Sequence, residues 1–226
     1  MLFRSKIDEC SIDKFVFNKL SKKFQKDTIE ALGIPENKII ESRFYPHIKA
    51  DKLIVPSFTY KGGLRCPKWA CDFLKTTFLK PEIILGKKNE SYDRIYIKRN
   101  LAKRRLVLNE AEVVNLLDGF GFVSVNLELM SLKEQALCMA NAKVVVAPHG
   151  AGLIDLVFCS QGIKVIEIFP PKYVNPIYWQ ISNVCALSYY YLIGELIGDD
   201  SEQPRNRDIM VDLEKLVKIL KLAAVI

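Results

Sequence analysis

The segment KVVVAPHGAGL, residues 143–153, constrains the fold of this chain more than any other part of its sequence. Residues 143–148 are mostly β-branched and apolar, and polar residues do not alternate with them. A strand with this pattern is buried on both faces, which requires a parallel sheet with helices on each side. The run ends in His149 and a glycine-rich turn, and a helix is expected from near Ala151. The segment therefore predicts a central strand that leads directly into a turn at the edge of the sheet.

The rest of the chain alternates strands and helices. From residue 90 onward a strand or helix pattern changes about every 20 residues, which predicts a Rossmann-like parallel α/β domain over residues 90–226. Residues 1–85 carry a shorter set of elements, and the polar segment 86–93 is the candidate linker. Strands are expected at 14–18, 37–42, 51–58, 94–99, 122–127, 143–148, 164–169 and 188–194, and helices at 21–34, 67–79, 175–187 and 208–225.

Local signals mark the ends of several helices. Asn109 precedes Glu112 by three positions, and Ser131 precedes Glu134 in the same way, so both are expected to cap helices. Gly33 is expected to close the first helix, because glycine readily adopts the left-handed conformation that ends helices.

Composition narrows the class of protein. The chain has 226 residues, half of them apolar, and a net charge of +7, which suits a soluble globular protein. No apolar run is long enough to span a membrane and the start lacks a secretory signal, so a cytoplasmic protein with at most peripheral membrane contact is expected. Six cysteines without a C-x-x-C pair favour buried free thiols, and two histidines make a zinc site improbable. No metal cofactor is predicted.

The turn at residues 148–152 is a candidate anion site. In a sheet of this kind, ligands bind beyond the carboxyl ends of the strands. Gly150 and Gly152 are expected to allow a tight turn that exposes N–H groups, and the helix that starts near Ala151 adds about half a positive charge. His149 can donate to a phosphate oxygen, and the alternative is a structural turn in which it only caps the strand. The G-x-G-x-x-G pattern of dinucleotide sites is not completed, so that fingerprint is weak.

A second element suited to anions follows another strand. The stretch KRNLAKRR, residues 98–105, holds five basic residues and no acid. Arg99, Lys103, Arg104 and Arg105 are therefore expected at the same sheet edge as His149. Arginine suits a diphosphate because its planar guanidinium can bond two oxygens at once. Two such elements at one edge favour a diphosphate ligand over nucleic acid, which the net charge alone would also allow.

Acidic and aromatic residues supply further candidates. Glu128 follows the second strand of the unit, where an acid often holds a ribose hydroxyl, and a solvated surface charge is the alternative. Glu167 lies within the strand VIEIF, where a carboxylate needs a partner, and an arginine is the expected one. The aromatic residues that either stack on a base or sugar or belong to the core are Tyr178, Trp179, Tyr189, Tyr190 and Tyr191.

Three segments in order resemble glycosyltransferase family 61: RIYIKRNLAKRRLVLNEAEVVNLL, LELMSLKEQALCMANAKVVVAPHGAGL and KVIEIF. The family includes bacterial polysaccharide enzymes, the type that this chain is expected to represent, and eukaryotic transferases of xylose and N-acetylglucosamine. The resemblance covers about residues 20–195. It is densest at Arg99, Arg104, Arg105, Asn109, Glu110, Ser131, Gln135, Ala142, His149 to Leu153 and Glu167.

The resemblance implies a fold and an activity. The fold is GT-B-like, with a partial acceptor-side half over residues 1–85 and a complete donor-binding half over residues 90–226. The activity is metal-independent, inverting transfer of a sugar from a nucleotide-diphosphate donor, expected to be UDP-linked, to a glycan acceptor, as in polysaccharide biosynthesis. Arg99, Arg104, Arg105 and residues 149–152 would bind the diphosphate, and Glu128 and Glu167 would support the nucleoside. The catalytic base is not identified, and His149 is its only candidate.

The chain departs from the family at two places. Members usually carry an aromatic-His-Trp block upstream of the region that corresponds to residue 10, so the first half is expected to be truncated. After His-Gly-Ala-Gly-Leu the family commonly continues Thr-Asn, where this chain has Ile154 and Asp155. The alternative function is therefore a non-catalytic relic that binds a nucleotide or a partner.

Overall fold

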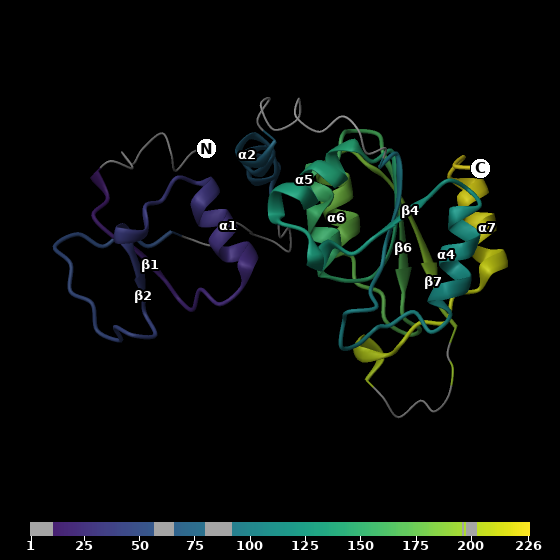
Figure 1. Ribbon diagram of the computed structural model, residues 1–226, viewed down its shortest axis with the longest axis horizontal. Coiled ribbons are helices and arrows are strands. Elements are labelled where there is room, and N and C mark those ends of the chain that lie inside the picture. Colours follow the sequence, from purple (N-terminus) through teal and green to yellow (C-terminus); the bar gives the residue numbers. More distant parts are fainter. Residues whose placement is uncertain (1–10, 57–65, 80–91, 196, 198–202) are drawn as a thin grey trace.

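A computed structural model describes residues 11–56, 66–79, 92–195, 197 and 203–226. Its centre is a five-stranded sheet in the order β4-β3-β5-β6-β7, and every neighbouring pair is parallel (Figure 1). The strands are β3 Arg94–Ile97, β4 Val123–Val125, β5 Val144–Pro148, β6 Lys164–Phe169 and β7 Ser188–Ile193. The predicted α/β class and parallel sheet are confirmed.

Helices cover both faces of this sheet (Figure 1). One face carries α2 Lys68–Phe78, α5 Leu132–Asn141, η4 Ala151–Phe158 and α6 Ile177–Val184, and the other carries α4 Glu110–Asp118 and α7 Leu213–Leu222. On β5, Val145 enters the first core layer and Val146 enters the second, so this strand is buried throughout, as its sequence predicts. Each fully buried valine contributes about 1.5–3 kcal/mol to folding.

The strand order creates a switch point between β3 and β5. From β3 the chain crosses through α4 to the edge strand β4, returns through α5 to β5, and then moves outward to β6 and β7. The direction of travel reverses between β3 and β5, and ligands of open α/β sheets bind beyond the carboxyl ends of such strands. Arg99 follows β3 and His149 follows β5, so both lie at this point.

Residues 11–56 form a two-stranded parallel sheet. Its strands are β1 Phe15–Phe17 and β2 Ile39–Glu41, joined by α1 Lys23–Ala31 and the short 3-10 helix η2 Glu36–Lys38. Gly33 follows α1 with a φ of 70°, in the left-handed region expected of it. The predicted strand at 51–58 is wrong for residues 51–56, which bend at 51 and 52 and form no strand. Leu53 and Val55 are exposed there, and Pro56 has no N–H to offer a sheet.

Helix starts agree only in part with the sequence signals. The capping box at Ser131 and Glu134 is confirmed, because each side chain accepts a hydrogen bond from the other residue's backbone N–H. Asn109 precedes α4, but its side chain makes no capping bond. Instead it donates to the Val211 carbonyl at 2.9 Å and accepts from the Val211 N–H at 3.0 Å. Two tertiary hydrogen bonds have replaced one local one.

The last helix begins later than predicted. Asp212 caps α7, whereas Ile209 and Met210 form bridges to Val107 and Glu195. These bridges satisfy backbone groups that a helix starting at residue 208 would otherwise use. Among the residues that the structure describes, no helix combines the length and the hydropathy that crossing a membrane requires. The candidate linker lies outside the described residues apart from residues 92 and 93, and the division into 1–85 and 90–226 stays a prediction.

The segment after β5 is a 3-10 helix rather than the expected α-helix. It is η4, which packs against α2, α5 and α6. A 3-10 helix has three residues per turn, so Leu153, Leu156 and Cys159 fall on one side, and all three are buried at 1%, 0% and 0% exposure. The spacing of these apolar residues accounts for the tighter helix.

Candidate functional site

The basic loop after β3 and the turn after β5 meet at the switch point. The Arg99 guanidinium lies so close to Gly150 that a Cβ on this glycine would be 1.8 Å from Nη1. The φ of Gly150 is 178°, which is extended backbone that any residue adopts. The chain bends at residues 149 and 150, but the backbone of Gly150 does not adopt a conformation that only glycine allows. Instead, a side chain at residue 150 would displace the Arg99 guanidinium. Gly152 is similarly confined, with Leu127 Cδ1 3.2 Å from the position of a Cβ.

A half-buried acid holds the backbone of Arg99. Glu110, at the start of α4, accepts hydrogen bonds at Oε1 from the Arg99 N–H at 3.1 Å and from the Tyr96 hydroxyl at 3.3 Å. Burial is the largest cause that raises the pKa of Tyr96, and the charge of Glu110 adds to it. The chemistry of Glu110 alone predicted no role for this residue, although it lies within a segment that resembles the family. It acts as a positioning residue for the start of the basic loop.

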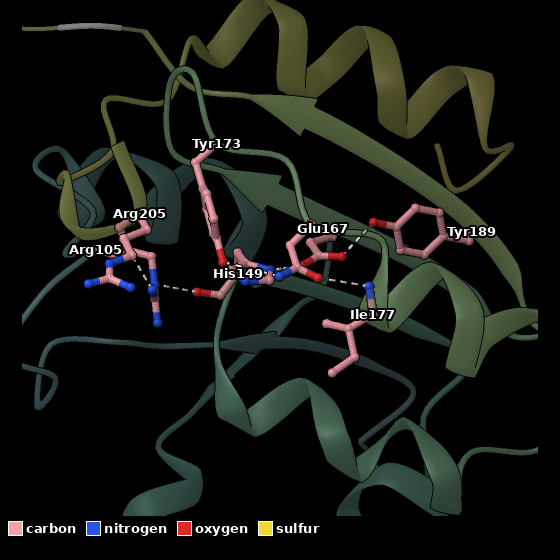
Figure 2. Close-up of polar contacts among 8 residues, drawn as sticks. Arg105, His149, Glu167, Tyr173, Ile177, Tyr189 and Arg205 are labelled. Carbon is pink, nitrogen blue, oxygen red and sulfur yellow. Dashed lines mark hydrogen bonds and ion pairs between the residues drawn. The ribbon is translucent and has the colours of Figure 1, made fainter. Parts of the chain in front are cut away.

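Arg105 clamps the turn from the other side. Its Nε donates to the His149 carbonyl at 3.1 Å, and its Nη1 donates to the Arg205 carbonyl at 2.8 Å (Figure 2). The backbone of Arg105 is left-handed, with a φ of 56°, and its N–H donates to the Asn206 carbonyl at 3.3 Å. Non-glycine residues adopt this conformation rarely and keep it where their surroundings enforce it. Arg105 therefore fixes the turn to residues 205–206.

The Arg104 side chain contacts Asn206 rather than the turn after β5. Its side chain is exposed, and Nη1 donates to Asn206 Oδ1 at 3.0 Å. Its carbonyl accepts from Arg99 Nη2 at 3.3 Å. The structure thus brings Arg99 and Arg105 to the turn, whereas the Arg104 side chain lies against the segment that contains Asn206.

The arginines at this edge form no direct ion pair with the described residues. Burial and the charge of Arg105 lower the pKa of Arg99, and burial and the charge of Arg104 lower the pKa of Arg105. Arg99 Nε is buried without a hydrogen-bond partner in that part of the chain. Half-buried cations that repel each other are stabilised by an anion between them.

Backbone donors adjoin these side chains. The His149 N–H is used in the sheet, where it donates to the Ile168 carbonyl at 2.8 Å. The first backbone bond of η4 runs from the Leu153 N–H to the Gly150 carbonyl at 3.0 Å. The N–H groups of residues 150–152 precede this bond, so they have no acceptor within the helix. That these N–H groups bind an anion stays a prediction.

Glu167 pairs with the His149 ring rather than with an arginine. The ring is 5% exposed, and its Nδ1 hydrogen-bonds Glu167 Oε1, while the Tyr189 hydroxyl donates to Oε2 at 2.5 Å (Figure 2). The prediction that an arginine pairs with Glu167 is wrong. Ala147 lies opposite Glu167 in the sheet, so the side chain at 149, two residues further on, emerges on the same face. With Nδ1–H donating to the carboxylate, Nε2 is the nitrogen that can exchange a proton.

Aromatic rings enclose the histidine. The ring centroid of His149 lies 5.1 Å from that of Phe169, 5.4 Å from that of Tyr173 and 5.3 Å from that of Tyr178. The sequence predicted no role for Phe169, although it ends the segment KVIEIF, or for Tyr173, which lies outside every motif. Strand alternation sends Tyr190 into the opposite core layer. Trp179 and Tyr191 are about half exposed, at 50% and 53%.

Glu128 lies beyond the strand that it was expected to close. β4 ends at Val125, and Glu128 is exposed on the 3-10 helix η3 Leu127–Leu129. Its charge opposes the lowering of the Arg99 pKa, so it is an electrostatic neighbour of the basic loop. Its assignment to the nucleoside stays a prediction. The described residues contain no group of three or more His, Cys, Asp or Glu side chains arranged to hold a metal ion.

Asp155 turns away from the arginines. It is 5% exposed within η4, and burial raises its pKa to about 7. Its charge acts on the Cys159 thiol, whereas the charges that act on Arg99 come from Arg105, Glu128, Tyr178 and Arg104. The acid that replaces the common family asparagine is therefore buried within η4.

Several known proteins are similar in sequence to parts of this chain. The family model described as Glycosyltransferase 61 matches residues 12–166, more than half of the chain. The Beta-1,2-xylosyltransferase RCN11 of Oryza sativa subsp. japonica is 26% identical over 157 residues, which are 62% of this chain and 28% of that protein. The Protein O-linked-mannose beta-1,4-N-acetylglucosaminyltransferase 2 of Homo sapiens is 38% identical over 77 residues, 33% of this chain and 13% of its own length. Its Xenopus tropicalis counterpart is 27% identical over 122 residues, 51% of this chain and 21% of its own length.

These alignments span less than a third of each relative. The matched range runs from β1 through the basic loop and the turn after β5 to β6. It therefore includes Arg99, His149 and Gly150. The chain belongs to glycosyltransferase family 61.

Proposed function

We propose that the chain binds a nucleoside diphosphate sugar at the β3–β5 switch point and takes part in transfer of the sugar to a glycan acceptor. The observation that carries the proposal is the Arg99 guanidinium packed on Gly150, beside the N–H groups of residues 150–152. The names of two relatives support transfer of a sugar, since one is a xylosyltransferase and the other an N-acetylglucosaminyltransferase. Residues 90–226 would form the donor half of a GT-B-like pair, and residues 1–85 would contribute to the acceptor side.

The chemistry of such a site is stabilisation of a leaving diphosphate. In an inverting transfer the acceptor oxygen bonds to the anomeric carbon as the bond from that carbon to the phosphate oxygen breaks. The diphosphate leaves with the electron pair, and a base takes the acceptor proton. Positive groups that are already in place stabilise the charge that develops on the leaving oxygen. Arg99 and the amides of residues 150–152 would supply this stabilisation, and the proposal requires no metal ion.

We assign His149 to the phosphate rather than to the acceptor proton. Glu167 and Tyr189 fix the orientation of its ring, and Phe169, Tyr173 and Tyr178 surround it. A ring held in this way can donate to an anion through Nε2 when it is protonated. UDP is the proposed nucleotide of the donor. The xylose and N-acetylglucosamine transferases of family 61 are expected to use UDP-linked sugars.

Calorimetric titration tests the binding step. UDP should bind the chain, whereas uridine should bind at least about tenfold more weakly, because the diphosphate makes the charge-assisted contacts. Arg99→Gln should weaken UDP binding by about tenfold or more. The matched control is Lys103→Gln, which removes an exposed positive charge from the same loop and should change the affinity by no more than about twofold. Equal effects of the two substitutions, or no UDP binding at millimolar concentration, would contradict the proposal.

Transfer is tested separately from binding. Labelled UDP-sugars are incubated with the chain and with glycan acceptors, and the product is resolved with its anomeric configuration. A product with inverted configuration is expected. Nucleotide binding without any transfer would instead assign the chain to the non-catalytic, nucleotide-binding alternative.

A further inference from the structure

Three thiols from two distant parts of the chain meet at the amino-terminal side of the sheet. Cys66 precedes α2, and its Sγ lies 3.2 Å from that of Cys71 within α2. Cys185, which directly follows α6, lines the same cavity as Cys71, and each of these two thiols affects the pKa of the other. All three thiols are free. Cys71 therefore adjoins two thiols, one within its own segment and one across the fold.

A cavity borders two of the three thiols, Cys71 and Cys185, and the third, Cys66, is reached from its own half-buried surface. The cavity has a volume of about 200 Å³, and its walls include Lys68, Cys71, Lys75, Gln161 and Cys185. Gln161 precedes β6, so the cavity opens at the edge of the sheet opposite the switch point. Cys71 and Cys185 are otherwise buried, at 2% and 9% exposure, and Cys66 is half-buried. A molecule the size of hydrogen peroxide fits into this space.

The three thiols differ in acidity. The hydrogen bond from Cys71 lowers the pKa of Cys66. The neighbouring Cys185 lowers the pKa of Cys71, but the bond to Cys66 and burial outweigh it and raise that pKa to about 11. The neighbouring Cys71 and burial raise the pKa of Cys185. The thiolate is the reactive form of cysteine, so Cys66 is the nucleophile of the group.

We propose that Cys66, Cys71 and Cys185 form a peroxide-reactive thiol site whose disulfide passes from Cys66–Cys71 to Cys71–Cys185. The Cys66 thiolate attacks one oxygen of hydrogen peroxide, the O–O bond breaks, and the products are a sulfenic acid and hydroxide. The Cys71 sulfur then attacks the Cys66 sulfur, water leaves, and the first disulfide forms. In total two thiols lose two electrons and one peroxide becomes two waters.

The third thiol moves the bond without further oxidation. The Cys185 sulfur attacks Cys71, and Cys66 leaves as a thiolate and takes up a proton, so a disulfide is exchanged for a thiol with no change in electron count. The first disulfide joins residues five positions apart and constrains only the start of α2. The second joins α2 to the end of α6, the helix that places Tyr178 against His149. The second disulfide would therefore link α2 covalently to the end of α6, the helix that carries Tyr178.

Peptide mapping of the oxidised chain tests this proposal. The reduced full chain is treated with hydrogen peroxide for increasing times, free thiols are alkylated, and disulfide peptides are identified by mass spectrometry. The Cys66–Cys71 disulfide should appear first and Cys71–Cys185 should replace it. Cys138 and Cys159 are the internal controls, because both are buried and should stay reduced until the chain unfolds.

Two substitutions separate the steps. Cys66→Ser should slow loss of the other two thiols by at least about tenfold, since both have raised pKa values and little thiolate at pH 8. Cys185→Ser should stop the reaction at the Cys66–Cys71 disulfide. The proposal is overturned if Cys66→Ser reacts at the wild-type rate, if the three thiols stay reduced, or if the disulfides join two chains or include Cys10. Circular dichroism of each variant verifies its fold, and UDP titration reports on the proposed function independently.

Discussion

The side chain of Arg99, rather than the backbone, explains why residue 150 is glycine. A Cβ there would collide with Nη1 at 1.8 Å, and Nη1 is the mobile end of a long side chain. Gly150→Ala should therefore displace the guanidinium, weaken UDP binding by about tenfold, and change the melting temperature little. Titration calorimetry and thermal unfolding measure the two effects.

The control for this substitution is Gly119→Ala. Gly119 ends α4 with a φ of −58°, and the nearest atom to an added Cβ is 3.4 Å away. It should keep UDP affinity and gain about 0.4–1 kcal/mol of stability. Unchanged UDP affinity in Gly150→Ala would show that Arg99 and the turn do not act together.

Asp155 predicts a pH-dependent stability. Burial raises its folded pKa to about 7, above its unfolded value near 4, so the folded chain binds the extra proton between these values. Its contribution is favourable below about pH 4 and is lost as the pH rises to 7, by up to about 4 kcal/mol. Asp155→Asn should therefore raise the free energy of unfolding at pH 8 and change it little at pH 4.

Denaturant unfolding at both pH values measures this difference. Ile154→Thr, which restores the other common family residue at a half-exposed position, is the neighbouring control and should show no such pH dependence. Equal effects of Asp155→Asn at pH 4 and pH 8 would mean that the carboxyl is not desolvated.

Residue positions were predictable where strand direction determines them. Parallel strands carry their carboxyl ends to one edge, so Arg99 and His149 could be placed together from the sequence. The partner of Glu167 could not be predicted, because it depends on the register of β5 against β6, which no local pattern encodes. Tyr173 lies in a loop, so no strand or helix period predicts its contact with His149.

At the scale of elements, the segment from Arg205 to Val211 holds the basic loop in place. Arg205 and Asn206 accept hydrogen bonds from Arg105, and Val211 is held by both atoms of the Asn109 amide. Asn109→Ala should lower the free energy of unfolding by about 1–3 kcal/mol and also weaken UDP binding. Thermal unfolding and calorimetry measure the two effects.

Ser131→Ala is the matched control for Asn109→Ala. It removes a helix cap at α5 and should cost about 1 kcal/mol of stability with no loss of UDP affinity. If both variants left UDP binding unchanged, the segment around Val211 would be only structural.

Element types followed from sequence more closely than element ends. The buried run of β5 and the capping box of α5 were readable because each signal is local. The 3-10 form of η4 could not be predicted, because it depends on the packing of Leu153. The late start of α7 could not be predicted either, because it depends on the pairing of Ile209 with Val107. Tertiary contacts override local propensity at such positions.

At the scale of the whole molecule, strand order places the site. Alternation of strands and helices predicted a parallel sheet, but not that β3 and β5 would be its central neighbours. That order depends on the side to which each crossover returns, which the sequence does not state. It brings the loop of Arg99 and the turn of Gly150 to one switch point, and it leaves the thiol cluster at the opposite edge.

A crystal structure of the chain soaked with UDP tests the central claim most directly. The account predicts diphosphate oxygens within hydrogen-bonding distance of the Arg99 guanidinium and of the N–H groups of residues 150–152, between the ends of β3 and β5. Ordered UDP elsewhere on the chain, with the Arg99 side chain still without an anion, would contradict it.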